Sequence, residues 1–538
     1  MKRILSLLLA LIMVIGIMPV SAFAAFDYAH NEAESSDDYY DIISKNDWDI
    51  APGITETEIV LNNEAGDRRQ VVHLMEADIS NPYTRVISSY TNMDTSNYAI
   101  STIPEHAAFI EEEWGENVVG AMNTCLSWYN SPAYAEDPSR VNEPLGFMMV
   151  DGEIYFDHSV GFPTCIVIHK DTNENGEARP ADIPKVEMRT VTDETCLNGW
   201  EDQVIPCSSG YIVKDGVNQS KPAHDSNTAA RSVVGVKADG SIVIMMNDGR
   251  QAPYSLGMNM YECAEVMIAA GCVYAANCDG GGSSTFMSQR PGESLNVNCS
   301  PCDGSLRQNT HGIIFISTAP ATGEFDNAYL ATENDYYVPY SEVTVNAFGR
   351  DFSGAEAEIP AEAEWTLEDD SFGTIENGVF TSNGKTGEVV IKMKYNEEVV
   401  GSKEIYIVNP KTVSFAQAST VIPYGKSVVL DIKAKYGEFD VVYDADDFDW
   451  EISDEEAGTR DGLTFTATNN TEKTGVTVTA TYKYADLGST KLSISFGKGS
   501  EILYNFEDGD ISEWLGKDAL IEWATVNNPN SPIFDAKP

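Results

Sequence analysis

Positive charge is scarce in this chain. Its 538 residues include 34 lysines and arginines against 84 aspartates and glutamates, a formal net charge of −50. Such an excess repels polyanions, so nucleic acid is not expected to be a partner. The acidity is typical of a well-solvated exported protein, and no loop has the aspartate spacing of an EF-hand.

Long hydrophobic runs are absent after the first residues. Lys2 and Arg3 precede an apolar run over residues 4–20, and Ala22-Phe23-Ala24 follows, which is the pattern of a secretory signal peptide. We therefore expect a signal peptide over residues 1–24, cleaved after Ala24. No later run is long enough to cross a bilayer, so we expect a secreted or cell-surface protein without a transmembrane segment in the mature chain.

Cysteine is confined to one part of the chain, because all nine cysteines lie between Cys125 and Cys302. An odd number leaves at least one thiol unpaired in a monomer, and spacing alone assigns no pairs. The single C-x-x-C, Cys299-Ser300-Pro301-Cys302, has no second pair to complete a zinc site and no following helical pattern of a thioredoxin motif. A local disulfide or reduced thiols fit it better. We expect no metal and no cofactor.

Two catalytic motifs are also missing. No G-x-S-x-G surrounds Ser283 or Ser284, which argues against a Ser-His-Asp hydrolase. No Gly-Lys-Ser/Thr follows the glycines that precede them, which excludes a nucleotide-binding P-loop. His224 and His311 stand alone, and an isolated histidine is more often a core or surface residue than an acid or base.

The most informative segment that is present is a run of three glycines after a carboxylate, Asn277-Cys278-Asp279-Gly280-Gly281-Gly282-Ser283-Ser284-Thr285. Glycines let the backbone approach a ligand, and their N–H groups, with the hydroxyls of Ser283 and Ser284, offer donors to an anion or a sugar. A flexible Gly/Ser linker is the alternative, but linkers do not lie between apolar runs. The segment predicts a binding site that begins at Asp279.

Two helix–glycine–strand units each place a polar residue at the end of a strand, Asn123 in one and Asp279 in the other. The units comprise a capping box at Thr102-Ile103-Pro104-Glu105, Gly115 and a strand over residues 118–122, then a helical pattern from Met260, Gly271 and a strand over residues 273–278. Each polar residue follows its glycine at the same spacing. If the two strands are neighbours, Asn123 and Asp279 belong to one site.

Changes in composition divide the chain into domains. Residues 25–57 are acidic and irregular, and we expect them to form a linker. Over residues 58–318, short strand patterns and Asp-Gly turns surround the two helices. This pattern predicts an α+β catalytic domain with a mixed sheet and a few helices.

A repeat follows, rich in threonine, valine and acidic residues. Pro339-Tyr340 recurs as Pro423-Tyr424, and Trp365 recurs as Trp450. The repeat length and the short alternating strands predict two all-β sandwiches over residues 325–410 and 411–497, which resemble bacterial Ig-like spacers. Residues 498–538 are expected to start a further β domain that ends early.

The order and spacing of several motifs resemble the phosphodiester glycosidase family. These motifs are Arg231-Ser232-Val233-Val234-Gly235, Asn247-Asp248-Gly249-Arg250, Gly257-Met258-Asn259-Met260-Tyr261-Glu262 and Asn277–Ser284, with Ser209, Gly210 and Arg307 at further family positions. The resemblance covers residues 59–317. It implies an exported hydrolase that cleaves the C1–O bond of glycosyl phosphodiesters of the N-acetylglucosamine-1-phosphodiester kind. The chain departs from the family at Thr124-Cys125, where the family has two glycines.

The chemistry of such a bond suggests a role for each group. The leaving group is a weakly basic phosphate monoester, so one carboxylate and a phosphate clamp can suffice. Asp279 would be nucleophile or general base, and Arg231 would clamp the phosphate with the glycine N–H groups and Arg307. Asn123 would bind the sugar or the phosphate. If the sugar carries a 2-acetamido group, that amide can attack C1 while Asp279 orients it.

Other candidates have equally good structural interpretations. Asp248 and Arg250 are as plausible in a turn and an ion pair as in substrate binding, the role also expected of Ser209 and Gly210. The alternative function is a non-catalytic cell-surface protein that binds glycans on the same scaffold. In both cases the partner is a carbohydrate, and the C-terminal β domains are expected to contact cell-wall polymer.

Overall fold

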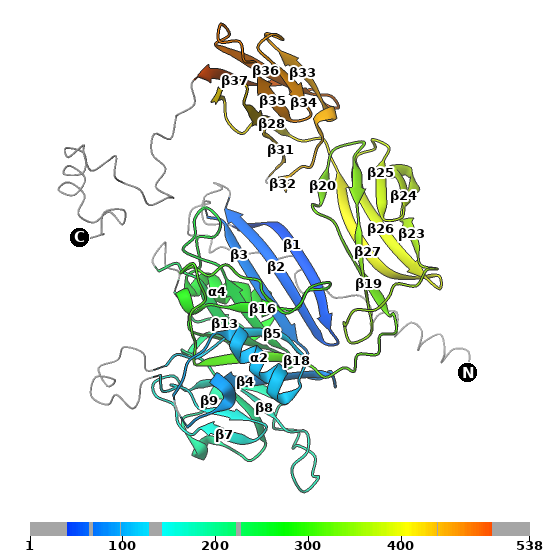
Figure 1. Ribbon diagram of the computed structural model, residues 1–538. Helices are drawn as coiled ribbons and strands as arrows, with labels where there is room; N and C mark the ends of the chain where they lie inside the picture. Colours follow the sequence, from blue (N-terminus) through cyan, green and yellow to red (C-terminus); the bar gives the residue numbers. More distant parts are fainter. Residues whose placement is uncertain are drawn as a thin grey trace, which may run out of the picture.

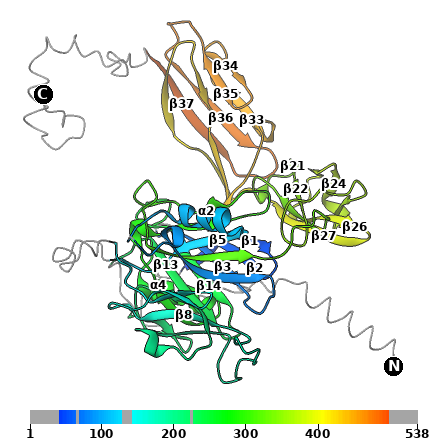
Figure 2. The ribbon, with the colours of Figure 1, turned by 60° about the horizontal axis from the view of Figure 1, so that its bottom comes forward.

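The computed structural model describes residues 40–63, 68–96, 98–127, 142–221, 227–437 and 439–497. A first domain is followed by two smaller β modules (Figure 1), and a second view places both modules to one side of it (Figure 2). The expected signal peptide, residues 25–39, His224 and the expected β segment at 498–538 lie outside the described residues.

An eight-stranded antiparallel sheet forms one layer of the first domain. In spatial order its strands are β1 (Tyr40–Ala51), β2 (Ile54–Asn63), β3 (Gln70–Ala77), β14 (Ile242–Asn247), β13 (Arg231–Lys237), β15 (Cys272–Asn277), β11 (Tyr211–Lys214) and β12 (Val217–Asn218). β1 pairs with β2 along its whole length. Residues 40–57 are therefore not an irregular linker, because Trp48, Ile50 and Ile54 bury their side chains in the domain core.

Two five-stranded sheets complete the first domain. One contains β17 (Asn296–Val297), β16 (Phe286–Ser288), β5 (Val118–Asn123), β18 (His311–Ser317) and β4 (Thr84–Tyr90); the other contains β7 (Glu153–Phe156), β6 (Met148–Val150), β10 (Glu201–Pro206), β8 (Thr164–His169) and β9 (Val186–Thr190). Described strand pairs in this domain are all antiparallel, so the expected mixed sheet is wrong. The Asp-Gly turns account for three of these pairs, β6–β7, β11–β12 and β13–β14, since a tight hairpin joins only antiparallel strands.

Each α-helix covers the outer face of one sheet. Helix α2 (Ile103–Trp114) begins at the predicted capping box and ends at Gly115, whose φ is 70°. Its apolar face packs on β5 and β18. Helix α4 (Met260–Ala269) packs on the eight-stranded sheet and is followed by Gly271 at φ 89°. Both glycines take the left-handed conformation that ends a helix at little cost.

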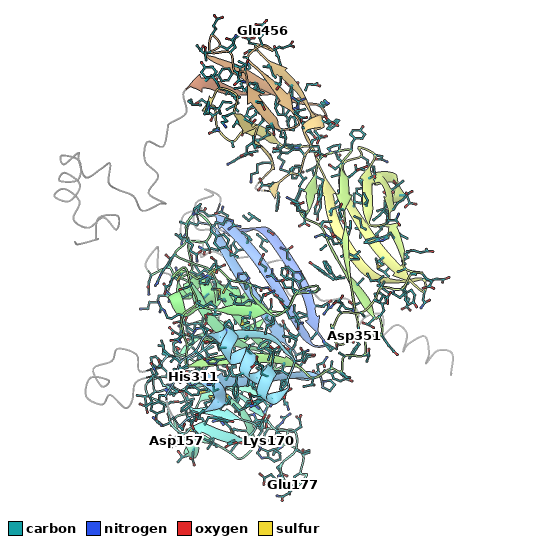
Figure 3. All side chains as sticks on the ribbon, in the orientation of Figure 1. Asp157, Lys170, Glu177, His311, Asp351 and Glu456 are labelled. Atoms are coloured by element: carbon teal, nitrogen blue, oxygen red, sulfur yellow. The ribbon has the colours of Figure 1, made fainter. Side chains whose placement is uncertain are left out.

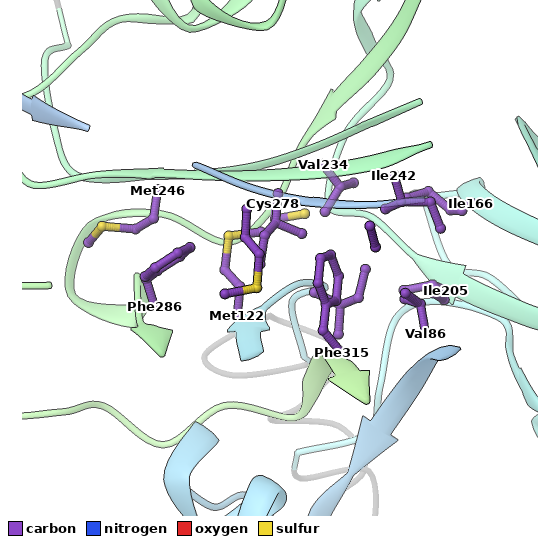
Figure 4. Close-up of a cluster of buried hydrophobic side chains, with 14 of the residues drawn as sticks. Val86, Met122, Ile166, Ile205, Val234, Ile242, Met246, Cys278, Phe286 and Phe315 are labelled. Atoms are coloured by element: carbon purple, nitrogen blue, oxygen red, sulfur yellow. The ribbon is translucent and has the colours of Figure 1, made fainter. Parts of the chain in front are cut away.

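The main hydrophobic core lies between the sheets (Figure 4). Its side chains come from all three sheets: Val234, Ile242 and Met246 from the eight-stranded sheet, Val86, Met122, Phe286 and Phe315 from the first five-stranded sheet, and Ile166 and Ile205 from the second. Met122 and Cys278 meet in this core. They precede Asn123 and Asp279, so the packing brings the two polar residues together.

The two modules repeat one β-sandwich pattern. The first contains β19 (Asn327–Ala331), β20 (Tyr336–Tyr337), β21 (Glu342–Thr344), β22 (Asn346–Arg350), β23 (Glu364–Leu367), β24 (Gly373–Glu376), β25 (Val379–Ser382), β26 (Gly387–Tyr395) and β27 (Glu398–Ile407). The second contains β28 (Thr412–Phe415), β29 (Ser419–Pro423), β30 (Ser427–Val429), β31 (Ile432–Tyr436), β32 (Phe439–Asp440), β33 (Phe448–Ile452), β34 (Gly458–Asp461), β35 (Thr464–Ala467), β36 (Gly475–Tyr482) and β37 (Ser489–Gly497). Each has a four-stranded sheet with one parallel pair, β20–β27 or β29–β37. Trp365 and Trp450 occupy equivalent strands, β23 and β33.

The first module contacts strand β1 through buried polar groups. Arg350 is 5% exposed and donates hydrogen bonds of 2.5 Å to the carbonyls of Asp49 and Ile50. The Trp48 indole donates to the Tyr329 hydroxyl at 2.8 Å, and the Arg290 guanidinium lies 3.8 Å from the centre of the Trp48 ring. These bonds satisfy a buried guanidinium and a buried indole, so they fix the first module on the edge of the sheet.

Among the described residues, no helix combines the length and apolarity that a bilayer crossing requires. The same residues contain no group of three or more histidine, cysteine or acidic side chains arranged to hold a metal ion. All nine cysteines are free thiols.

Two histidines are buried side by side in the first domain. His311 on β18 is 0% exposed (labelled in Figure 3), has no hydrogen-bond partner for either ring nitrogen in the described structure, and packs on the Phe156 ring. His106 is 1% exposed and pairs one nitrogen with the Ser89 hydroxyl at 3.0 Å. Burial lowers the pKa of His311 to about 3 and that of His106 to about 4. Both are neutral core residues in the native state.

We predict that this pair destabilises the protein in acid. The unfolded chain binds protons at these histidines below about pH 6.5, whereas the native state resists protonation until about pH 4 and below. Stability from this source is complete above pH 6.5 and falls as the pH drops. In His311→Phe, which can pack beside Phe156, the slope of unfolding free energy against pH should decrease by up to about 1.4 kcal/mol per pH unit. Urea unfolding between pH 4.5 and 7.5 measures both slopes, and equal slopes would contradict the prediction.

Candidate active site

The carboxyl ends of β5 and β15 meet, although these strands belong to different sheets. The N–H of Asp279 donates to the carbonyl of Thr124 at 2.7 Å, and the amide of Asn123 donates to the carbonyl of Asp279 at 2.6 Å. The expectation that these strands are neighbours is wrong, but the two residues do converge. The contact crosses from one sheet to the other.

The side chain of Asn123 is fully used inside the protein. It is 0% exposed, and its oxygen accepts hydrogen bonds from the Ser232 hydroxyl at 2.8 Å and from the N–H of Thr285 at 3.0 Å. With its amide on Asp279, this residue joins β5, β13 and both ends of the glycine segment. Asn123 is therefore placed to position Asp279 rather than to touch a ligand, which differs from the role expected of it.

Each of the three glycines faces a different arginine. A Cβ at Gly280 would lie 3.5 Å from Cδ of Arg231, and one at Gly281 would lie 3.2 Å from a guanidinium nitrogen of Arg250. A Cβ at Gly282 would overlap Asp303 and Arg307. At Gly280 a Cβ would also lie 3.0 Å from the carbonyl oxygen of Ala230, and Gly281 has a φ of 65°, so backbone contacts and conformation as well as side chains favour glycine in this segment.

The glycine N–H groups offer fewer free hydrogen-bond donors to a ligand than the sequence suggests. The N–H of Gly281 donates to the carbonyl of Ala230 at 2.7 Å, so this donor is not free for a ligand. The segment contains a short 3₁₀ turn, Gly281–Ser283, and the arginine side chains lie beside this turn.

Arg231 and Arg250 have no carboxylate within ion-pair distance among the described residues. Arg231 donates instead to the carbonyls of Met258, at 3.1 Å, and Asn227. Burial lowers the pKa of Arg231, and the positive charge of Arg250 lowers it further. Guanidinium groups without a carboxylate partner among the described residues are suited to bind an anion.

Arg307, in contrast, is paired. Its guanidinium forms an ion pair with Asp303, four residues earlier, and the two side chains are 51% and 40% exposed at the mouth of the site. Sequence reasoning missed Asp303, because Cys302-Asp303-Gly304 has the composition of an ordinary turn. The acidic residue four positions before Arg307 was the feature of the sequence that could have indicated this ion pair.

Asp279 is the carboxylate at the centre of this arrangement. Burial raises its pKa to about 6, although hydrogen bonds from Ser283 and the N–H of Gly280 and the charge of Arg307 all favour the ionised form. The residue remains partly accessible to solvent. At neutral pH it is therefore largely ionised, and it is more basic than an exposed aspartate.

Three buried side-chain oxygens around Asp279 have no hydrogen-bond partner within the described structure. They are Thr124 Oγ1, Asn277 Oδ1 and Ser284 Oγ. Buried polar atoms are almost always satisfied, and exceptions concentrate where a ligand or water completes the bonding. Water or a ligand can complete the bonding of these three oxygens.

The remaining predicted residues lie close by or inside the protein. The Ser209 hydroxyl donates to the carbonyls of Gly210, at 2.9 Å, and of Asn277, at 3.4 Å, so this pair borders the end of β15. Asp248 is 0% exposed and accepts hydrogen bonds from the Ser300 N–H at 2.8 Å and the Tyr254 hydroxyl at 3.0 Å. Asp248 therefore supports the loop that carries Arg250 and has no surface to offer a substrate.

The cysteines beside the site are not nucleophiles. Cys125, Cys207 and Cys278 are buried behind Asp279, where Cys125 donates to the carbonyl of Cys207 at 3.4 Å. Burial raises the pKa of Cys125 and of Cys278 well above the ordinary thiol value. Neutral buried thiols are unreactive, so Asp279 is the only plausible nucleophile among these groups.

Comparison with known proteins assigns this region. Residues 118–316 match the model of the phosphodiester glycosidase family, whereas no curated protein matches the chain. The solved catalytic domain of zebrafish N-acetylglucosamine-1-phosphodiester alpha-N-acetylglucosaminidase, auto-inhibited by its pro-peptide, is 16% identical, with a TM-score of 0.34 over 51% of this chain and 88% of that chain. A Synechocystis protein is 12% identical, with a TM-score of 0.32 over 49% of this chain and 62% of that chain.

The modules also have similar solved structures. The Escherichia coli adhesin FdeC is 11% identical, with a TM-score of 0.16 over 55% of this chain and 90% of that chain. These TM-scores are low, so the assignment depends on the family match. Asp279, Arg231, Arg250 and Arg307 all lie within the matched segment. Residues 118–316, from β5 to β18, are a phosphodiester glycosidase family domain.

Proposed function

We propose that this protein is a hydrolase that cleaves the C1–O bond of glycosyl phosphodiesters, with N-acetylglucosamine-1-phosphodiester units in cell-wall or capsular glycopolymers as its substrate class. The observation that carries the proposal is the pair Arg231 and Arg250, without carboxylate partners in the described structure, beside the glycines that follow Asp279. This pair would supply a phosphate clamp close to Asp279, a carboxylate without an ion pair in the described structure. That combination suits a substrate whose leaving group is a phosphate monoester.

In the proposed reaction, the guanidinium groups of Arg231 and Arg250 bind the phosphodiester oxygens. The bond between C1 and the phosphate oxygen breaks, and its electron pair leaves with the phosphate, whose growing negative charge the arginines stabilise. Because a phosphate monoester is a weak base, it needs no proton from the protein to leave. This explains how one carboxylate can replace the usual pair of a glycosidase.

Asp279 acts on C1 itself. In one route its carboxylate oxygen forms a bond to C1, and water then hydrolyses the glycosyl ester; in the other it takes a proton from the water that attacks C1. With a substrate that carries a 2-acetamido group, the amide oxygen can attack C1 while Asp279 orients the amide. All three routes require the ionised carboxylate, which the pKa of about 6 provides at neutral pH.

The departure from the family at Thr124 and Cys125 does not argue strongly against turnover. These side chains are 0% and 2% exposed, so both are packed within the protein. The competing function, a glycan-binding surface protein without catalysis, was favoured chiefly by this departure. The retained clamp and carboxylate support the enzyme.

We further propose that the protein acts outside the cell, at the cell surface. The pattern of residues 1–24 favours export, and two successive β-sandwich modules suit spacers that hold the domain away from a cell surface. Contact with cell-wall polymer would then involve the modules, and the polymer would also supply the substrate.

We predict that Asp279→Asn lowers kcat about 10³-fold, because an amide cannot act as nucleophile or base. Arg231→Lys keeps the charge but loses the planar fork, and we expect kcat/KM to fall about tenfold. Release of free sugar from chromogenic and phosphodiester-linked N-acetylglucosamine measures both. Asp157→Asn, on an exposed carboxylate of the same domain (Figure 3), is the matched control and should retain activity. Absence of turnover in the wild type, together with glycan binding that survives Asp279→Asn, would instead establish the binding protein.

The pH dependence gives a separate prediction. Since Asp279 must be ionised, kcat/KM should rise with pH through about 6 and level off above it. The charge of Arg307 lowers the pKa of Asp279, so Arg307→Gln should move the rising limb to higher pH. Arg460→Gln in the second module should leave the midpoint in place. Activity that decreases through pH 6 as the pH rises would show that Asp279 acts as an acid, contrary to the proposal.

A further inference from the structure

The charges around the glycine segment do not balance to zero. Arg231 faces Gly280, Arg250 faces Gly281, and Arg307 faces Gly282. The cluster also contains two carboxylates, which oppose these three positive charges: Asp279, and Asp303 in its ion pair with Arg307. With Asp279 ionised, the cluster has one net positive charge.

Asp303 is the member of this cluster that neither the fold nor the proposed reaction requires. It lies in a turn closed by a 2.9 Å hydrogen bond from the N–H of Gly304 to the carbonyl of Pro301. Its ion pair with Arg307 is largely exposed, and exposed pairs add little to stability. Its carboxylate nevertheless occupies the space over Gly282, directly beside the clamp.

The substrate and the product of the proposed reaction differ in charge. A phosphodiester carries one negative charge at neutral pH, whereas a phosphate monoester carries about 1.5 to 2. Any net positive charge attracts the monoester more strongly than the diester, because the electrostatic energy scales with the charge of the ligand. The carboxylate of Asp303 lowers the net positive charge of the site, so it weakens binding of the monoester more than binding of the diester.

We propose that Asp303 lowers the net positive charge of the clamp and so reduces its affinity for the doubly charged phosphate monoester more than its affinity for the singly charged phosphodiester, which favours release of the product. This inference rests on the proposed function. Asp303 partly neutralises Arg307 while the substrate is bound, and its carboxylate repels the extra charge that appears on the phosphate when the C1–O bond breaks. Product release is thus favoured by a residue that does not touch C1.

Binding of methyl phosphate and dimethyl phosphate to the full chain at pH 7.5, measured by calorimetry, tests this proposal. Asp303→Asn removes the charge and keeps the shape. Because the electrostatic energy scales with ligand charge, a gain of about tenfold in affinity for methyl phosphate should accompany only about threefold for dimethyl phosphate. Glu177→Gln, which removes one negative charge from an exposed loop of the same domain (Figure 3), is the control and should change neither affinity.

A second variant tests whether the effect of Asp303→Asn comes from the lost charge or from displacement of the side chains. Gly282→Ala keeps both charges and displaces the flexible ends of Asp303 and Arg307 together; because this pair is neutral, the relative affinity for the two probes should stay closer to that of the wild type than in Asp303→Asn. Equal gains for both probes in Asp303→Asn would overturn the charge role and leave the phosphate site standing. If neither probe binds to the wild type or to any variant, the phosphate site itself is wrong, and this proposal falls with it.

Discussion

The side-chain amide of Asn123 is the interaction on which the candidate site depends. Its oxygen accepts hydrogen bonds from the Ser232 hydroxyl on β13 and from the backbone N–H of Thr285. Its nitrogen donates to the carbonyl of Asp279. No strand pairing joins β5 to β13 or β15, so this amide ties the two sheets together at the point where the glycine segment passes between them. An aspartate of the same size would present oxygen to oxygen at Asp279, which explains why an amide is needed here.

The arrangement of charges around Asp279 differs from that in the rest of the first domain. The chain is strongly acidic, and most of the arginines in its first domain are paired: Arg85 with Glu116, Arg189 with Glu201, and Arg290 with Glu56. Against this background Arg231 and Arg250 face a site whose own carboxylate is buried enough to have a raised pKa. Burial makes Asp279 more basic than an exposed aspartate.

The sequence predicts local features well and long-range ones poorly. The capping box at Thr102, the glycine at the end of each helix and the Asp-Gly hairpins follow from the chemistry of adjacent residues, and all appear in the structure. The convergence of Asn123 and Asp279 was expected from neighbouring strands, whereas packing between two sheets produces it. The burial of Asn123 and the position of Asp303 depend on contacts between distant segments, which spacing along the chain does not encode.

Strand β1 has a further consequence for how the protein is built. It is an edge strand of twelve residues, and a long unpaired edge is a template for association with other chains. Its outer side faces the first module across a cavity of about 760 Å³, and Arg350 of that module bonds the β1 backbone. The first module therefore covers the edge strand of the first domain. The contact crosses the point where the composition of the sequence changes, so that change does not separate two independent structural units.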